Sequence, residues 1–84
     1  MNKYLIKILV PELEIDFDIY IPNNKKVGTI KEQILKSIKD ITNGTYDKAM
    51  NDVRMIDREY GIEYDNNLYI KDTKIRNCTI LVII

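Results

Sequence analysis

The fold is decided by a stretch in which apolar and polar side chains alternate without a fault. It reads Leu13-Glu14-Ile15-Asp16-Phe17-Asp18-Ile19-Tyr20-Ile21. Successive side chains of a β-strand point to opposite faces of the sheet, so this alternation predicts a strand with one buried and one solvated face. Pro22 ends the strand, because proline cannot donate to a ladder and Asn23 and Asn24 after it favour a turn.

The residues before this stretch predict a second strand that pairs with it as a hairpin. Residues 4–10 are mostly aliphatic, with β-branched side chains at the alternate positions Ile6, Ile8 and Val10. Pro11 then breaks the run, as a proline early in a tight turn does. The two strands are therefore expected to be antiparallel neighbours.

After the hairpin the spacing of apolar residues changes to that of a helix. Steps of three or four separate most of the residues Val27, Ile30, Ile34, Leu35, Ile38 and Ile41. We expect the charged residues between them to face outward, namely Lys31, Glu32, Lys36 and Lys39. The start stays open, because Lys26 is a poor N-cap whereas Thr29 with Glu32 fits a capping box and would start the helix later. Asn43 and Gly44 supply the end.

The rest of the chain predicts shorter elements. A helical turn is expected within residues 45–52 and a third strand over residues 53–57. Residues 62–64 predict a short fourth strand, and an irregular or 3₁₀ stretch follows from residues 68–70. The last run, residues 79–84, is apolar on both faces, which is typical of a central strand.

Composition excludes several classes of function. The chain has 84 residues, with 13 Lys or Arg, 13 Asp or Glu, one cysteine and no histidine. Zero net charge removes the bulk attraction on which nucleic-acid binding mostly rests, so no nucleic-acid partner is expected. The absence of histidine excludes imidazole catalysis and histidine zinc sites, and we expect no cofactor and no enzymatic activity. One cysteine cannot form an intramolecular disulfide, which favours the reducing cytoplasm.

Length and hydropathy limit the organisation of the chain. A chain of this size predicts one domain over residues 1–84. The apolar run that begins at Leu5 is interrupted by Lys7 and is too short for a signal peptide. No stretch approaches the roughly 20 apolar residues that a membrane-spanning helix needs, so we expect no direct membrane insertion.

The order of elements resembles the β-grasp fold of the ubiquitin superfamily. Two groups of residues carry this resemblance, over nearly the whole chain. The alternating strand and the helix contribute Phe17-Asp18-Ile19-Tyr20-Ile21-Pro22 with Val27, Ile30, Lys31 and Ile34. The C-terminal part contributes Leu68, Lys71-Asp72-Thr73-Lys74-Ile75-Arg76-Asn77, Leu81 and Ile83. The resemblance implies an α+β fold, with one helix packed on one face of a mixed sheet of four to five strands.

Within that superfamily the C-terminus distinguishes two kinds of function. Conjugated modifiers and sulfur carriers end in Gly-Gly, because the backbone must thread a narrow channel without a Cβ atom. This chain ends in Leu81-Val82-Ile83-Ile84, so we expect neither conjugation nor sulfur carriage. The chain is most similar to the YukD type, small bacterial ubiquitin-like proteins encoded beside type VII (WXG100) secretion systems. That resemblance implies a cytoplasmic accessory or regulatory protein; a carrier activated at its C-terminus and a small RNA-associated regulator are the alternatives.

The main candidate site is the sheet face opposite the helix. Six residues are expected there: Leu5, Lys7, Leu9, Ile56, Val82 and Ile84. The resemblance implies an interface here, since ubiquitin uses this face for its partners and Ile56, Val82 and Ile84 occupy matching positions. A contiguous apolar patch on a small protein usually marks an interface, whereas single exposed aliphatic side chains are common. The sequence does not distinguish a second copy of the chain from a different protein as the partner.

The charged residues offer weaker candidates. Glu14, Asp16 and Asp18 are expected along the outward face of an edge strand, as a docking row, a weak Ca²⁺ site or, preferably, a protection against strand pairing. Alternate carboxylates lie about 7 Å apart along a strand, which is too far for a metal cage without loop ligands. A basic face is expected beside the helix, formed by Lys25, Lys26, Lys31, Lys36 and Lys39. It lacks the aromatic residues that stack on bases, so a solvated face is favoured over RNA or lipid binding.

The remaining reactive side chains predict no chemistry. Cys78 is expected in a turn, with no histidine to act as its base and no second cysteine to resolve it. Asp57, Arg58 and Glu59 cluster near a turn, but a catalytic carboxylate pair needs a cleft. The six tyrosines are expected at half-buried rims with their hydroxyls outward.

Overall fold

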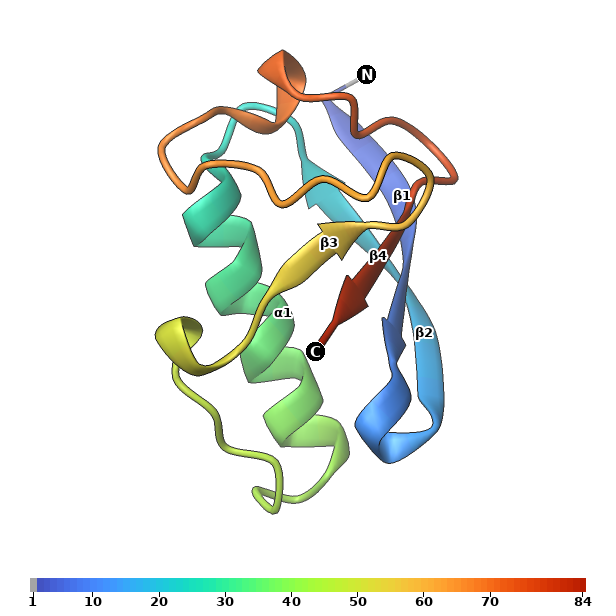
Figure 1. Cartoon of the computed structure of the whole chain (residues 1–84), viewed down its shortest axis with the longest axis vertical. Helices are drawn as coiled ribbons and strands as arrows, with labels where there is room; N and C mark the ends of the chain where they lie inside the picture. Colours follow the sequence, from blue (N-terminus) through green and yellow to red (C-terminus); the bar gives the residue numbers. More distant parts are fainter. Residues whose placement is uncertain (1) are drawn as a thin grey trace.

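A computed structural model describes residues 2–84, which form one helix and a four-stranded sheet (Figure 1). The strands and the helix are β1 (Lys3–Val10), β2 (Ile15–Pro22), α1 (Val27–Ile41), β3 (Met55–Asp57) and β4 (Ile80–Ile83). Three 3₁₀ turns lie between them, at Pro11–Leu13, Met50–Asp52 and Ile70–Asp72. The order in the sheet is β2-β1-β4-β3, and α1 lies against one side of it.

The pairing of the strands agrees with the sequence-based expectation. β1 and β2 are antiparallel, with Ile6 opposite Ile19, and β4 lies parallel to β1 in the middle of the sheet. β3 pairs antiparallel with β4 through Ile56 and Val82. The expected strand over residues 62–64 is not formed, because Ile62 makes only one isolated bridge, to Asp57. The sheet therefore has four strands among the described residues.

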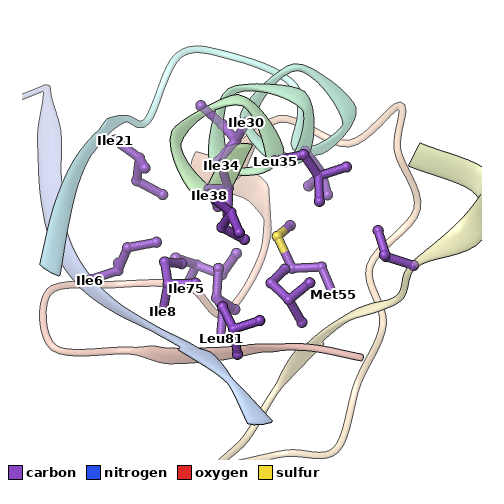
Figure 2. Close-up of a cluster of buried hydrophobic side chains, with 14 of the residues drawn as sticks. Ile6, Ile8, Ile21, Ile30, Ile34, Leu35, Ile38, Met55, Ile75 and Leu81 are labelled. Carbon is purple, nitrogen blue, oxygen red and sulfur yellow. The ribbon is translucent and has the colours of Figure 1, made fainter. Parts of the chain in front are cut away.

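The core lies between α1 and the sheet and consists almost entirely of aliphatic side chains (Figure 2). The sheet contributes Ile6, Ile8, Ile21, Met55 and Leu81, and these point toward the helix in Figure 2. The helix contributes Ile30, Ile34, Leu35 and Ile38, as the spacing of three and four predicts. Many β-branched residues thus occupy a helix, because burial outweighs their weak helix propensity.

The helix begins at Val27, which decides the start that the sequence left open against the later start at Thr29. Lys26 makes no side-chain cap. Instead, the N–H groups of Val27 and Gly28 donate to the carbonyls of Leu68 and Asn66, at N···O distances of 2.8 and 3.0 Å. A loop distant in sequence therefore supplies the acceptors that a capping side chain normally provides.

Other boundaries also differ from the sequence-based prediction: β3 begins at Met55 rather than at residue 53, and β4 covers Ile80–Ile83 rather than residues 79–84. β2 begins at Ile15 rather than Leu13, because residues 11–13 form a 3₁₀ turn that closes at Glu14 with a φ of 54°. Residues 45–52 contain only the 3₁₀ turn at Met50–Asp52. The predicted helix end is confirmed by the positive φ angles of Asn43 and Gly44.

Candidate functional site

The sheet face opposite α1 carries the six residues predicted to form an interface. The register places Leu5, Lys7 and Leu9 of β1 on the face that also carries Ile56 and Val82, because directly paired residues share a face. Ile84 continues that face past the end of β4, where its N–H donates to the carbonyl of Arg54. The structure therefore brings all six together on one face.

A seventh residue, Ile80, belongs to the same surface and was missed. It lies beside Lys7 in the register and is half-buried. The alternation of the last strand could have found it, since Ile80, Val82 and Ile84 share one parity. We call this surface the open face and define it by Leu5, Lys7, Leu9, Ile56, Ile80, Val82 and Ile84.

Solvent reaches the open face unevenly. Leu5 is 36% exposed and Ile84 is 55% exposed, and Lys7 is also exposed. Leu9, Ile56, Ile80 and Val82 are half-buried, because neighbouring side chains of the same face cover their flanks. The centre of the face is thus a shallow aliphatic surface with one cation, Lys7, among its apolar residues.

Charged residues extend this surface in rows that cross the sheet. The register aligns one row as Asp18, Lys7, Ile80, Arg58. It aligns the next row as Asp16, Leu9, Val82, Ile56. Carboxylates therefore lie at the β2 edge and guanidinium groups at the β3 edge, where Arg54 precedes Ile56 by two residues and pairs with Ile84. Among residues 2–84, Arg58 makes no salt bridge, whereas Arg54 Nε bonds to Glu63 Oε1 at 3.1 Å.

The acidic row on β2 is shorter than predicted. Asp16 and Asp18 lie on the outward face of an edge strand, as expected, but Glu14 lies in the turn before it. Within the described part of the chain, no group of three or more Asp, Glu or Cys side chains could hold a metal ion. The calcium alternative thus gains no support from the geometry of these residues.

The predicted basic face is wrong for Lys31. Its side chain is only 6% exposed, and its Nζ atom donates to the carbonyl of Val53 at 2.7 Å. The long aliphatic stem packs with the core while the ammonium group reaches a backbone acceptor. Lys39 lies 3.3 Å from a carboxylate oxygen of Asp47, so its charge is also partly matched.

Asp57 is a buried structural carboxylate rather than part of a surface cluster. It is 1% exposed, and its Oδ1 atom accepts the N–H of Glu59 at 3.1 Å. Its Oδ2 atom accepts the hydroxyl of Tyr64 at 2.7 Å. Burial, and next this hydrogen bond to a carboxylate, raise the pKa of Tyr64 well above its ordinary value. Arg58 and Glu59 are exposed, and the pocket that they line with Cys78 does not include Asp57.

The tyrosine prediction is therefore wrong at two positions. The hydroxyl of Tyr64 points inward to Asp57, and Tyr46 is buried in the core cluster. The predicted half-burial also differs at Tyr20, Tyr60 and Tyr69, which are exposed.

Cys78 lies in the predicted turn, at the end of the open face. It is exposed, has a φ of 71°, and donates its N–H to the carbonyl of Leu5 at 2.8 Å. The neighbouring Asn77 accepts the N–H of Leu5 through its side-chain oxygen at 2.9 Å. This turn thus extends the sheet by two hydrogen bonds beyond the registered pairs of β1 and β4.

Comparison with known proteins identifies the fold. No family model matches the chain, and no curated protein matches it in sequence. Among solved structures, it is similar to a ubiquitin-like domain of an Arabidopsis thaliana protein, with a TM-score of 0.75 and 14% identity over 100% of this chain and 78% of that chain. It is also similar to a ubiquitin of Caldiarchaeum subterraneum, with a TM-score of 0.72 and 12% identity over 96% and 90% of the two chains.

A third similar structure is a chain of the ESX-5 inner membrane complex. The TM-score is 0.75 with 11% identity, over 99% of this chain but only 21% of that chain. Among residues 2–84, no helix has the length and apolar character needed to cross a membrane. At these identities the comparisons show the fold alone. The chain therefore has the ubiquitin-like fold, an α+β arrangement of one helix against a mixed four-stranded sheet.

Proposed function

We propose that this protein is a non-enzymatic interaction module that binds a protein partner through the open face. The observation that carries the proposal is the gathering of six aliphatic residues, from three neighbouring strands, on the one side of the sheet that α1 does not cover. Contiguous apolar surface of this kind is uncommon on a small protein unless something binds to it.

The energetics of the open face favour contact with protein. Burying apolar surface contributes about 25 cal/mol per Å², and the half-buried residues at the centre are already held in place by their neighbours. Leu9, Ile56 and Val82 therefore lose little side-chain freedom when they bind. The charges of Asp18 and Arg58 at the two edges are placed to set the orientation of a partner.

The finer proposal is that the module serves a type VII secretion system of a Gram-positive bacterium, in the cytoplasm. It rests on the resemblance to the YukD type, and the similarity to a chain of the ESX-5 inner membrane complex supports it. The neighbouring genes test it directly: a WXG100 gene or a secretion ATPase gene beside this one is expected, and a neighbourhood without either would remove this part of the proposal.

The proposal assigns the function to contact rather than to activation of a C-terminus. Ile83 ends β4, and the N–H and carbonyl of Ile84 both bond to Arg54, so Ile84 is held beside the sheet. The alternative is a carrier that is activated at a flexible Gly-Gly segment. A mass spectrum of the protein from its native cell, showing it free of isopeptide-linked forms, is the expected result.

Affinity capture from the native cell tests the open face. We expect Ile56→Asp combined with Val82→Asp to abolish capture of the partner and to leave the fold intact, because two carboxylates would be desolvated at the centre of the contact. The matched control is Ile41→Asp combined with Leu68→Asp, which places the same charges at exposed apolar positions outside the open face. Equal capture by both double variants would refute the proposal.

A further inference from the structure

We infer that the open face binds a second copy of this chain, sheet against sheet, with a two-fold axis parallel to the strands. The inference rests on the proposed function in its choice of surface and goes beyond it in naming the occupant. Its basis is the order of charges across the sheet. Only in this orientation does the acidic edge of one copy face the basic edge of the other.

The charges change sign from one edge of the open face to the other. Asp16 and Asp18 lie on β2, and Arg58 lies three strands away on the β3 edge, where Arg54 is already paired with Glu63. Strands are about 4.8 Å apart, so the acidic and basic edges are separated by roughly 14 Å. This separation is too large for the two edges to neutralise each other within one chain.

Consider a two-fold axis that is parallel to the strands and lies above the gap between β1 and β4. This axis packs the second sheet over the first, with each row of the second sheet running in the opposite direction. The row Asp18, Lys7, Ile80, Arg58 then meets a copy that runs in the opposite sense. Asp18 of each chain faces Arg58 of the other, and Leu9 faces Val82 in the next row. Because the contact is isologous, each of these pairs occurs twice.

The opposite choice of axis is unfavourable. A two-fold axis perpendicular to the strands would place β2 over β2, with Asp16 and Asp18 near their own copies, and β3 over β3, with Arg58 near Arg58. Like charges in juxtaposition oppose such a contact. Both axes keep the strands of the two sheets roughly aligned, which is the common geometry for sheets packed face to face, so the charges decide between them.

The dimer is expected to be weak. The face is only four strands wide, which is at the small end for specific interfaces. Lys7 lies near its centre, between Asp18 and Ile80, and this cation adds a desolvation cost. Association is therefore expected at high protein concentration, and more strongly at low salt, where the charges are less screened.

Two single charge reversals and their mixture test the inference. Asp18→Arg alone sets one arginine against another in both copies of the edge pair, and Arg58→Asp alone sets one aspartate against another in both. We expect each variant to dimerise about tenfold more weakly than the wild type, because two surface charge pairs change sign. An equimolar mixture of the two variants restores an attractive pair at one edge of the contact by exchanging the charges, and leaves the native residues Asp18 and Arg58 paired at the other. The mixture should therefore form a heterodimer at wild-type strength, measured by sedimentation velocity at low salt.

A matched control separates this result from attraction between oppositely charged proteins. Glu32→Arg and Lys36→Asp make the same changes in net charge on the exposed side of α1, and their mixture should dimerise no better than the wild type. A wild type that stays monomeric, single variants that dimerise unchanged, or a mixture that stays monomeric would each overturn the inference. If it fails while Ile56→Asp with Val82→Asp still abolishes capture, the proposed function stands with a different partner.

Discussion

The buried hydrogen bond between Tyr64 and Asp57 gives the most quantitative prediction. Tyr64→Phe removes the hydroxyl that donates to Asp57 Oδ2 at 2.7 Å. Because Asp57 is 1% exposed, water cannot replace the lost donor. The other oxygen of this carboxylate stays bonded to the N–H of Glu59, so one buried acceptor is left unpaired.

The expected loss follows from the charge on the acceptor. Hydrogen bonds to charged groups contribute about 1.5–3 kcal/mol, and we expect Tyr64→Phe to lower the free energy of unfolding by that amount. With a urea m-value of about 1 kcal/mol/M for a small domain, the midpoint should fall by roughly 1.5 M or more. Urea titration followed by circular dichroism measures both quantities.

The control is Tyr20→Phe, because that side chain is 64% exposed on the side of the sheet away from the core. It should leave the free energy of unfolding within about 0.5 kcal/mol of the wild type. If Tyr64→Phe is equally harmless, the hydroxyl does not stabilise a buried carboxylate and the account of Asp57 is wrong.

The remaining predictions concern the pH dependence and the helix. Because the pKa of Tyr64 is raised in the folded state, its contribution to stability is fully present below pH 10 and is lost as the pH rises above that value, where the unfolded chain ionises first. A spectrophotometric titration of the phenol groups should show a step above the ordinary tyrosine range, and Tyr64→Phe should remove the part of that step that belongs to Tyr64. Lys31→Ala should cost about 1–3 kcal/mol in thermal or urea unfolding, whereas Lys36→Ala, on the exposed side of the same helix, should cost less than about 0.5 kcal/mol; equal effects would contradict the burial of Lys31. Gly28→Ala should destabilise the protein although alanine favours helices, because a Cβ atom there would lie 3.1 Å from the Cβ atom of Asn66; a gain in melting temperature would contradict the contact between loop and helix.

The sequence predicts the parts of this fold that depend on local periodicity. The alternation of residues 13–21 locates β2, and the spacing of Ile30, Ile34 and Ile38 locates the buried side of α1. What it could not predict depends on contacts between distant segments. The helix begins at Val27 because a loop much later in the chain accepts its first N–H groups, and no local pattern reports such an acceptor.

The candidate site was predictable to a similar extent. Parity along each strand assigns six residues to the open face, and the register of the sheet then adds Ile80 and aligns the charges of Asp18 and Arg58 in one row. The sequence did not predict the burial of Lys31. A lysine near the apolar stripe of a helix looks the same in sequence whether its ammonium group contacts water or a backbone carbonyl.

Carbene footprinting of the open face tests the central claim most directly. The labelling of each residue would be compared between dilute purified protein and the same protein in concentrated native-cell extract. The account predicts that Leu5, Leu9, Ile56 and Val82 become protected in the extract while Ile41 and Leu68, outside the open face, stay equally labelled. Unchanged labelling of the open face, or protection confined to α1, would contradict it.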